Sequence, residues 1–167
     1  MLAAFLLLSL AGVLRSAPPA TNSAVAEAPR PASKPDGGEA AAGKPLFEQF
    51  CAACHGISGA GMAPLAPPLT NSNWLRGPEG RLIRIVLNGL EGPIQVNGTN
   101  YAPPAIMPEM ASLAALDDEQ IASILSFLRR DWGRGAGPVS AAQVARIRSE
   151  TANRETPWTE RELSQIK

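Results

Sequence analysis

The pentapeptide Cys51-Ala52-Ala53-Cys54-His55 contains both cysteines and the only histidine of this 167-residue chain. Two thiols at this spacing can each add to a vinyl group of haem, and the adjacent imidazole then faces the iron as an axial ligand. The chain has few aromatic residues and 31 glycines and prolines (15 and 16), so a haem would replace much of the apolar core. The pentapeptide therefore predicts one covalently attached haem c and a small, loop-rich fold built around it.

A cysteine pair at this spacing has two other common uses. A structural zinc site needs four nitrogen or sulfur ligands, and the side chains of Cys51, Cys54 and His55 supply only three. A thioredoxin-like redox pair should lie in a βαβ unit, which the surrounding sequence does not show. A Cys51–Cys54 dithiol or disulfide in a protein without haem remains the alternative.

The N-terminal quarter of the chain predicts export followed by a linker. The apolar run Met1–Leu14 has the length of a signal sequence and is shorter than the roughly 20 residues that span a bilayer. We assign residues 1–16 to a signal sequence or an N-terminal anchor, because no basic residue precedes the run and Arg15 follows it. Residues 17–42 are rich in Ala, Pro, Ser and Gly, which predicts a linker.

Helices are predicted in the rest of the chain, which we divide into a haem-binding domain (43–132) and a helical C-terminal extension (133–167). A first helix should run from about Lys44 or Pro45 into the cysteine motif. Later helices should span about 78–88, about 117–131 with an apolar stripe facing the core, and two short stretches after Ser140 and Thr159. The stretches 56–73 and 91–108 should be loops.

Methionine is the predicted sixth ligand of the iron, because a second histidine does not exist in the chain. Met1 lies in the signal, and Met62 follows His55 by only seven residues. That leaves Met107 and Met110, of which Met107 is favoured because its proline-rich loop would hold a ligand at low entropic cost. An iron with His and Met ligands has no open position and a raised potential, which favours electron transfer.

These features resemble class I monohaem cytochromes c, an all-α fold, over residues 43–132. The closest resemblance is to the cytochrome c modules found with quinoprotein or sugar and alcohol dehydrogenases. It rests on Leu46–Cys51, Leu82–Leu90, Asp118–Ala122 and Pro157–Thr159. The resemblance implies that Cys51 and Cys54 form the haem thioethers.

The family pattern also implies further site residues. The carbonyl of Pro67, or alternatively Pro68, would accept a hydrogen bond from the His55 ring and so fix the imidazole. In the family the methionine ligand usually precedes a proline, which supports Met107. The family's usual distance from this methionine to the start of the last helix of the domain fits Met110 better. Trp74, Tyr101 and Arg84 are further candidates for the haem pocket. For Arg84 a solvated helix face is the preferred interpretation.

The resemblance implies a carrier of single electrons and not an enzyme. Since c-type cytochromes receive haem outside the cytoplasmic membrane, we expect a periplasmic protein, with membrane contact only if residues 1–16 are not cleaved. A dehydrogenase would be the donor and an oxidase or another cytochrome the acceptor.

The formal net charge of zero gives no basic field for nucleic acid. The alternative is a haem-based gas sensor or peroxidase-like enzyme with an open sixth site. The C-terminal extension should either wrap the core or dock the dehydrogenase.

Overall fold

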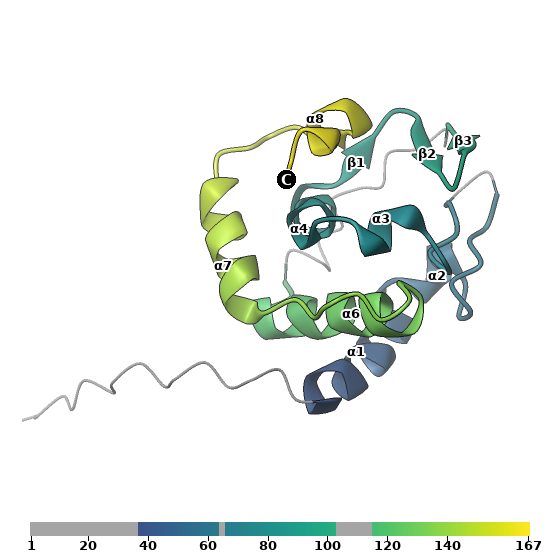
Figure 1. Cartoon of the computed structure of the whole chain (residues 1–167). Helices are drawn as coiled ribbons and strands as arrows, with labels where there is room; N and C mark the ends of the chain where they lie inside the picture. The colour runs from purple at the N-terminus through teal and green to yellow at the C-terminus, as the bar shows by residue number, and fades with distance from the viewer. Residues whose placement is uncertain (1–36, 64–65, 103–114) are drawn as a thin grey trace, which may run out of the picture. The chain divides into compact units, whose positions relative to one another are not determined.

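The computed structural model describes residues 37–63, 66–102 and 115–167, with side chains from residue 42 onward (Figure 1). The predicted signal sequence, most of the predicted linker, and both Met107 and Met110 lie outside these residues. Within the described part, the helices are α1 (Gly37–Phe50), α2 (Ala52–His55), α3 (Asn73–Arg76), α4 (Glu79–Asn88), α6 (Asp118–Asp131), α7 (Ala141–Glu150) and α8 (Glu160–Ser164). In this part of the chain no helix is long and apolar enough to cross a membrane.

Helices α1 and α6 form the central packing of the domain. They approach so closely at Gly43 that a Cβ atom there would lie 2.0 Å from the carbonyl oxygen of Ser123. One turn later Phe47 is fully buried, with its ring centroid 6.0 Å from that of Phe127 and 5.0 Å from that of Trp132. This crossing fixes the end of α1, and α1 leads directly into the cysteine motif.

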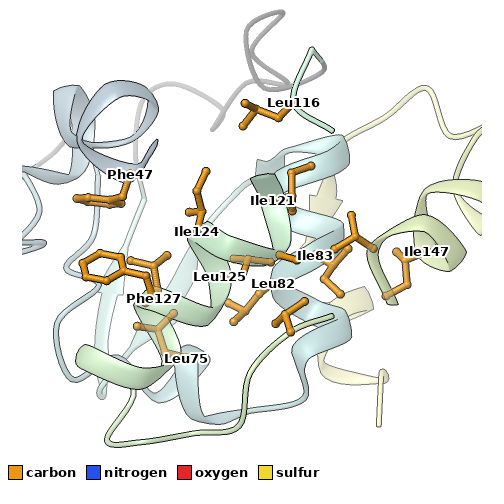
Figure 2. Packing of buried hydrophobic residues seen from close by; sticks show 14 residues of the cluster. Phe47, Leu75, Leu82, Ile83, Leu116, Ile121, Ile124, Leu125, Phe127 and Ile147 are labelled. Atoms are coloured by element: carbon orange, nitrogen blue, oxygen red, sulfur yellow. The ribbon is translucent and has the colours of Figure 1, made fainter. Parts of the chain in front are cut away.

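The apolar side chains of α4 and α7 complete the core on the other face of α6 (Figure 2). The predicted apolar stripe of α6 is buried as expected, because Ile121, Ile124, Leu125 and Leu128 are each at most 6% exposed. Val144 and Ile147 of α7 are equally buried in the same cluster. Residues beyond 138 therefore contribute side chains to the main core.

Two small pairs of strands lie beside the helices. β2 (Ile94–Val96) and β3 (Thr99–Tyr101) form an antiparallel hairpin. β1 (Leu90–Glu91) pairs in parallel with β4 (Trp158–Thr159), which joins the segment after α4 to the C-terminal segment. Arg81 strengthens this junction by donating to the carbonyl oxygen of Ile166 at 2.8 Å.

Several helix boundaries agree with the sequence predictions. Capping boxes open α6 at Asp117, α7 at Ser140 and α8 at Thr159, and α4 ends at Asn88, followed by Gly89 as its C-cap. The predicted start of the first helix is wrong, because α1 begins at Gly37 and includes Pro45 in its interior. An interior proline removes one helical hydrogen bond, and the alanine-rich turn before it has a high helix propensity.

Candidate haem-binding site

Cys51 lies between α1 and α2 as the N-cap of α2, and Cys54 lies within α2. The N–H of Cys51 donates to the Phe47 carbonyl at 2.8 Å, and the N–H of His55 donates to the Cys51 carbonyl at 3.0 Å. Helical hydrogen bonds thus connect the motif to the end of α1 that is buried against α6. Gly56, with φ of 72°, then ends α2 in a conformation that favours glycine.

Both thiols are free and half-buried. Burial raises the pKa of the Cys51 thiol to about 11, with the nearby Cys54 as the smaller cause. Cys51 is therefore a protonated thiol near neutral pH. Two free thiols on one short helical segment are the donor set that thioether attachment to haem requires.

His55 is held by the carbonyl of a distant residue. Its Nδ1 atom donates to the carbonyl oxygen of Pro67 at 3.1 Å, which is the contact implied by the family pattern. Burial lowers the pKa of the ring, and the hydrogen bond to Pro67 opposes that shift. The neutral ring with its proton on Nδ1 leaves the lone pair of Nε2 available for a metal ion.

The loop that brings Pro67 to His55 is fixed by backbone hydrogen bonds. Gly59 accepts from the N–H of Leu69 at 2.8 Å, and the N–H of Gly61 donates to the His55 carbonyl at 2.9 Å. A Cβ atom at Gly61 would lie 2.7 Å from the Pro67 carbonyl carbon, and one at Gly59 would lie 2.5 Å from the Trp132 ring. In the sequence, Gly59 and Gly61 indicate only a loop, and no local pattern shows their role in placing Pro67.

Trp74 lies on α3 and faces the β2–β3 hairpin. Its indole N–H donates to the carbonyl of Gln95 at 2.9 Å. The side chain of Asn73 accepts from the backbone N–H of Asn97 at 2.9 Å, so the start of α3 is also tied to this hairpin. The indole donor of this candidate for the haem pocket is thus engaged with the protein backbone.

The two other candidates for the haem pocket, Arg84 and Tyr101, have different neighbours from Trp74. Arg84 contacts the C-terminal segment, since its guanidinium donates to Glu150 at 2.8 Å and lies 5.7 Å from the ring centroid of Trp158. Its side chain is 16% exposed, so the preferred expectation of a solvated helix face is wrong for this residue. Tyr101 ends β3, half-buried, opposite Ile94.

Arg129 is a buried residue that the sequence analysis did not single out. It is 6% exposed and donates to three backbone carbonyls, those of Leu75 at 3.0 Å, Gly77 at 2.7 Å and Gly137 at 2.6 Å. Burial lowers the pKa of its guanidinium. Because two of the three acceptors lie more than 50 residues away in sequence, no local pattern could have indicated this role.

Taken together, the free thiols and the oriented imidazole have the chemistry and spacing that c-type haem attachment requires. A cytochrome c family model matches residues 40–132. The chain belongs to the cytochrome c family, and the resemblance to class I monohaem cytochromes c is confirmed. Its cofactor is haem c, attached covalently and containing iron.

Curated relatives match a larger part of the chain. Cytochrome c-552 of Thermus thermophilus is 32% identical over 134 residues, which cover 75% of this chain and 98% of the relative. The gluconate 2-dehydrogenase cytochrome c subunit of Pantoea cypripedii is 35% identical over 121 residues, 68% of this chain and 25% of that subunit. The alcohol dehydrogenase (quinone) cytochrome c subunit of Gluconobacter oxydans (strain 621H) is 31% identical over 120 residues, 70% of this chain and 24% of that subunit.

The similarity therefore extends over roughly a quarter of each dehydrogenase subunit. The family and these relatives make the chain an electron carrier rather than a catalytic enzyme, working with redox partner proteins.

Proposed function

We propose that this protein carries single electrons in the periplasm, accepting them from a dehydrogenase and passing them to an oxidase or another cytochrome of a respiratory chain. The observation that carries the proposal is the hydrogen bond from His55 Nδ1 to Pro67 beside two free thiols. Because Nδ1 is held by this hydrogen bond, the imidazole keeps its Nε2 atom directed at one position. A fixed ligand reduces the reorganisation that accompanies each change of iron charge.

The proposed roles of the site residues follow from their chemistry. Cys51 and Cys54 hold the cofactor covalently, and His55 binds the iron through Nε2. When bound, haem c supplies a reversible ferric/ferrous couple. Met107, or alternatively Met110, completes the coordination, and Trp74 packs near the cofactor edge.

A dehydrogenase donor is supported by the relatives that are cytochrome c subunits of gluconate and alcohol dehydrogenases. Export is supported by the apolar run Met1–Leu14. Cell fractionation and mass determination of the mature N-terminus test the location. A haem-loaded protein recovered only from the cytoplasm would overturn it.

Absorption spectra of oxidised and dithionite-reduced protein test the site itself. The protein should be matured with a cytochrome c assembly system and compared with Met107→Ala and Met110→Ala. Sharp low-spin bands in wild type, lost in only one variant, would establish a six-coordinate carrier and identify its distal ligand. A high-spin wild type that shifts with carbon monoxide or peroxide would instead support the sensor or enzyme alternative.

A further inference from the structure

One side chain takes part in the backbone contacts that follow Pro67. The carbonyl oxygen of Gly59 accepts from the N–H of Leu69 at 2.8 Å and from the N–H of Thr70 at 3.1 Å. The hydroxyl of Thr70, a half-buried residue, donates to the same oxygen at 3.2 Å. The position of the chain just after Pro67 thus depends on a hydroxyl group as well as on the backbone.

Gly59, the acceptor of these hydrogen bonds, is itself held against the core. It lies so close to Trp132, the C-cap of α6, that an added Cβ atom would be 2.5 Å from the indole ring. The N–H of Gly59 donates to the Gly56 carbonyl at 2.9 Å. The N–H of Asn71 donates to the carbonyl of Trp132 at 3.0 Å, and Figure 1 shows the loop beside this end of α6. Thr70 is therefore bonded to a fixed point of the structure.

The two consecutive prolines link the position of Thr70 to that of the Pro67 carbonyl. The ring of Pro68 fixes its φ angle. A residue that precedes a proline, as Pro67 does, is restricted to extended conformations. Few torsions are thus free to absorb a shift of Thr70. Such a shift should move the carbonyl oxygen that accepts from His55.

We propose that Thr70 is a positioning residue for His55, whose hydroxyl strengthens the hydrogen bond between His55 and Pro67 and so lowers the redox potential of the haem. The inference rests on the proposed function, because it takes His55 as the iron ligand. A firmly held Pro67 carbonyl makes the imidazole a more basic ligand, which favours ferric iron. Loss of the Thr70 hydroxyl should therefore raise the midpoint potential.

Substitutions at two threonines separate positioning from general stability. Thr70→Val and Thr70→Ala remove the hydroxyl, whereas Thr70→Ser keeps it. Thr151→Val is the matched control, because Thr151 also donates both its N–H and its hydroxyl to one carbonyl oxygen, that of Ile147, at 2.9 Å each. Thr151 directly follows α7, which Figure 1 shows on the side of the domain opposite α2. The control thus removes the same type of hydrogen bond far from Pro67.

The single histidine of the chain gives a direct measurement of the hydrogen bond to Pro67. In matured ferrous protein with isotopically labelled histidine, the Nδ1–H signal in the NMR spectrum comes only from His55. Its exchange with solvent measures how often the hydrogen bond opens. Exchange through global unfolding would rise in Thr151→Val as well, because that control also loses a hydroxyl donor. A redox titration of each variant gives the midpoint potential.

Thr70→Val and Thr70→Ala should speed exchange of the Nδ1 proton about fivefold, the effect of losing one net hydrogen bond, and should raise the midpoint potential. Thr70→Ser and Thr151→Val should exchange within about twofold of wild type and keep its potential. Equal exchange rates and equal potentials in Thr70→Val and Thr151→Val would overturn the role of Thr70 alone. A ferrous wild type whose histidine ring protons show no ring-current shift from haem would overturn the proposed function, and this inference with it.

Discussion

The Nδ1 atom of His55 lies 3.1 Å from the carbonyl oxygen of Pro67, across a separation of twelve residues. The contact depends on the close fit of Gly61, whose missing side chain lets the Ala66–Pro68 backbone pass beside it. Gly61 also has φ of 77°, a conformation that other residues adopt only with strain. The orientation of the proposed iron ligand therefore depends on Gly61, which also donates its N–H to the His55 carbonyl at 2.9 Å.

Replacing Gly61 by alanine should displace Pro67 and weaken its hydrogen bond to His55. We expect Gly61→Ala to lower the free energy of unfolding by about 3 kcal/mol, from the strain at positive φ and the clash with backbone atoms. The haem midpoint potential should rise, because a less basic imidazole stabilises ferric iron less well. Urea denaturation and redox titration measure the two effects.

Gly92→Ala is the matched control. Gly92 has φ of 74° but would have no heavy atom within 4 Å of an added Cβ. Gly92→Ala should lower the free energy of unfolding by about 1 kcal/mol because of backbone strain, and it should leave the haem midpoint potential unchanged. Equal effects of the two substitutions on the potential would show that Gly61 does not position His55.

Arg129→Ala should be strongly destabilising. The substitution leaves three backbone carbonyls without their charged donor, at a cost of about 3 kcal/mol or more. The adjacent Arg130 is exposed and pairs only with Asp131, so Arg130→Ala should change stability by less than about 0.5 kcal/mol. Urea titrations of the two variants give the comparison, and similar losses in both would refute the structural role of Arg129.

Removing residues 138–167 should abolish the fold and the low-spin haem spectrum. The removed segment includes Val139, Val144, Ile147 and Leu163, which are all at most 1% exposed. Each buried apolar side chain of this size contributes about 1.5–3 kcal/mol, and domains of this kind are stable by only about 5–15 kcal/mol. Circular dichroism and the absorption spectrum check this. An intact spectrum with lost reduction by a partner would instead identify the segment as a docking element.

Glu162 should contribute stability that disappears in acid. Hydrogen bonds from the backbone and hydroxyl of Thr159, together with Arg154, lower its pKa from 4.5 to about 2. Because the folded pKa is depressed, the contribution is complete above 4.5 and is lost as the pH falls toward about 2. The effect is small because the pair is exposed to solvent.

Glu162→Gln isolates this contribution from other titrating groups. The difference in unfolding free energy between wild type and Glu162→Gln should be constant above pH 4.5 and shrink toward about pH 2. Urea titrations across that range measure it. A difference that does not change with pH would exclude the Glu162 carboxylate as its origin.

Local signals in the sequence were enough to predict several helix boundaries. Asp117 with Gln120 and Ser140 with Gln143 satisfy each other's backbone groups within one turn, so their spacing carries the information. The β2–β3 hairpin was missed, although Asn97-Gly98 between Val96 and Thr99 is a strong hairpin signal. Both residues have positive φ, as such a turn requires.

Contacts between residues that are distant in sequence could not be predicted from local sequence patterns. Leu90 pairs with Trp158, and Arg129 donates to residues more than 50 positions away. Such contacts depend on how the helices pack, which periodicity does not encode. The motif residues of the site were predictable because thioether chemistry demands a fixed spacing. Pro67 was found only through the family resemblance.

A redox titration of the matured wild-type protein, followed by absorption and paired with its intact mass, tests the central claim most directly. The account predicts a mass that includes one covalently bound haem and a single reversible one-electron transition with low-spin spectra in both states. A mass of the polypeptide alone, or bound haem that does not cycle reversibly, would contradict the assignment of this protein as an electron carrier.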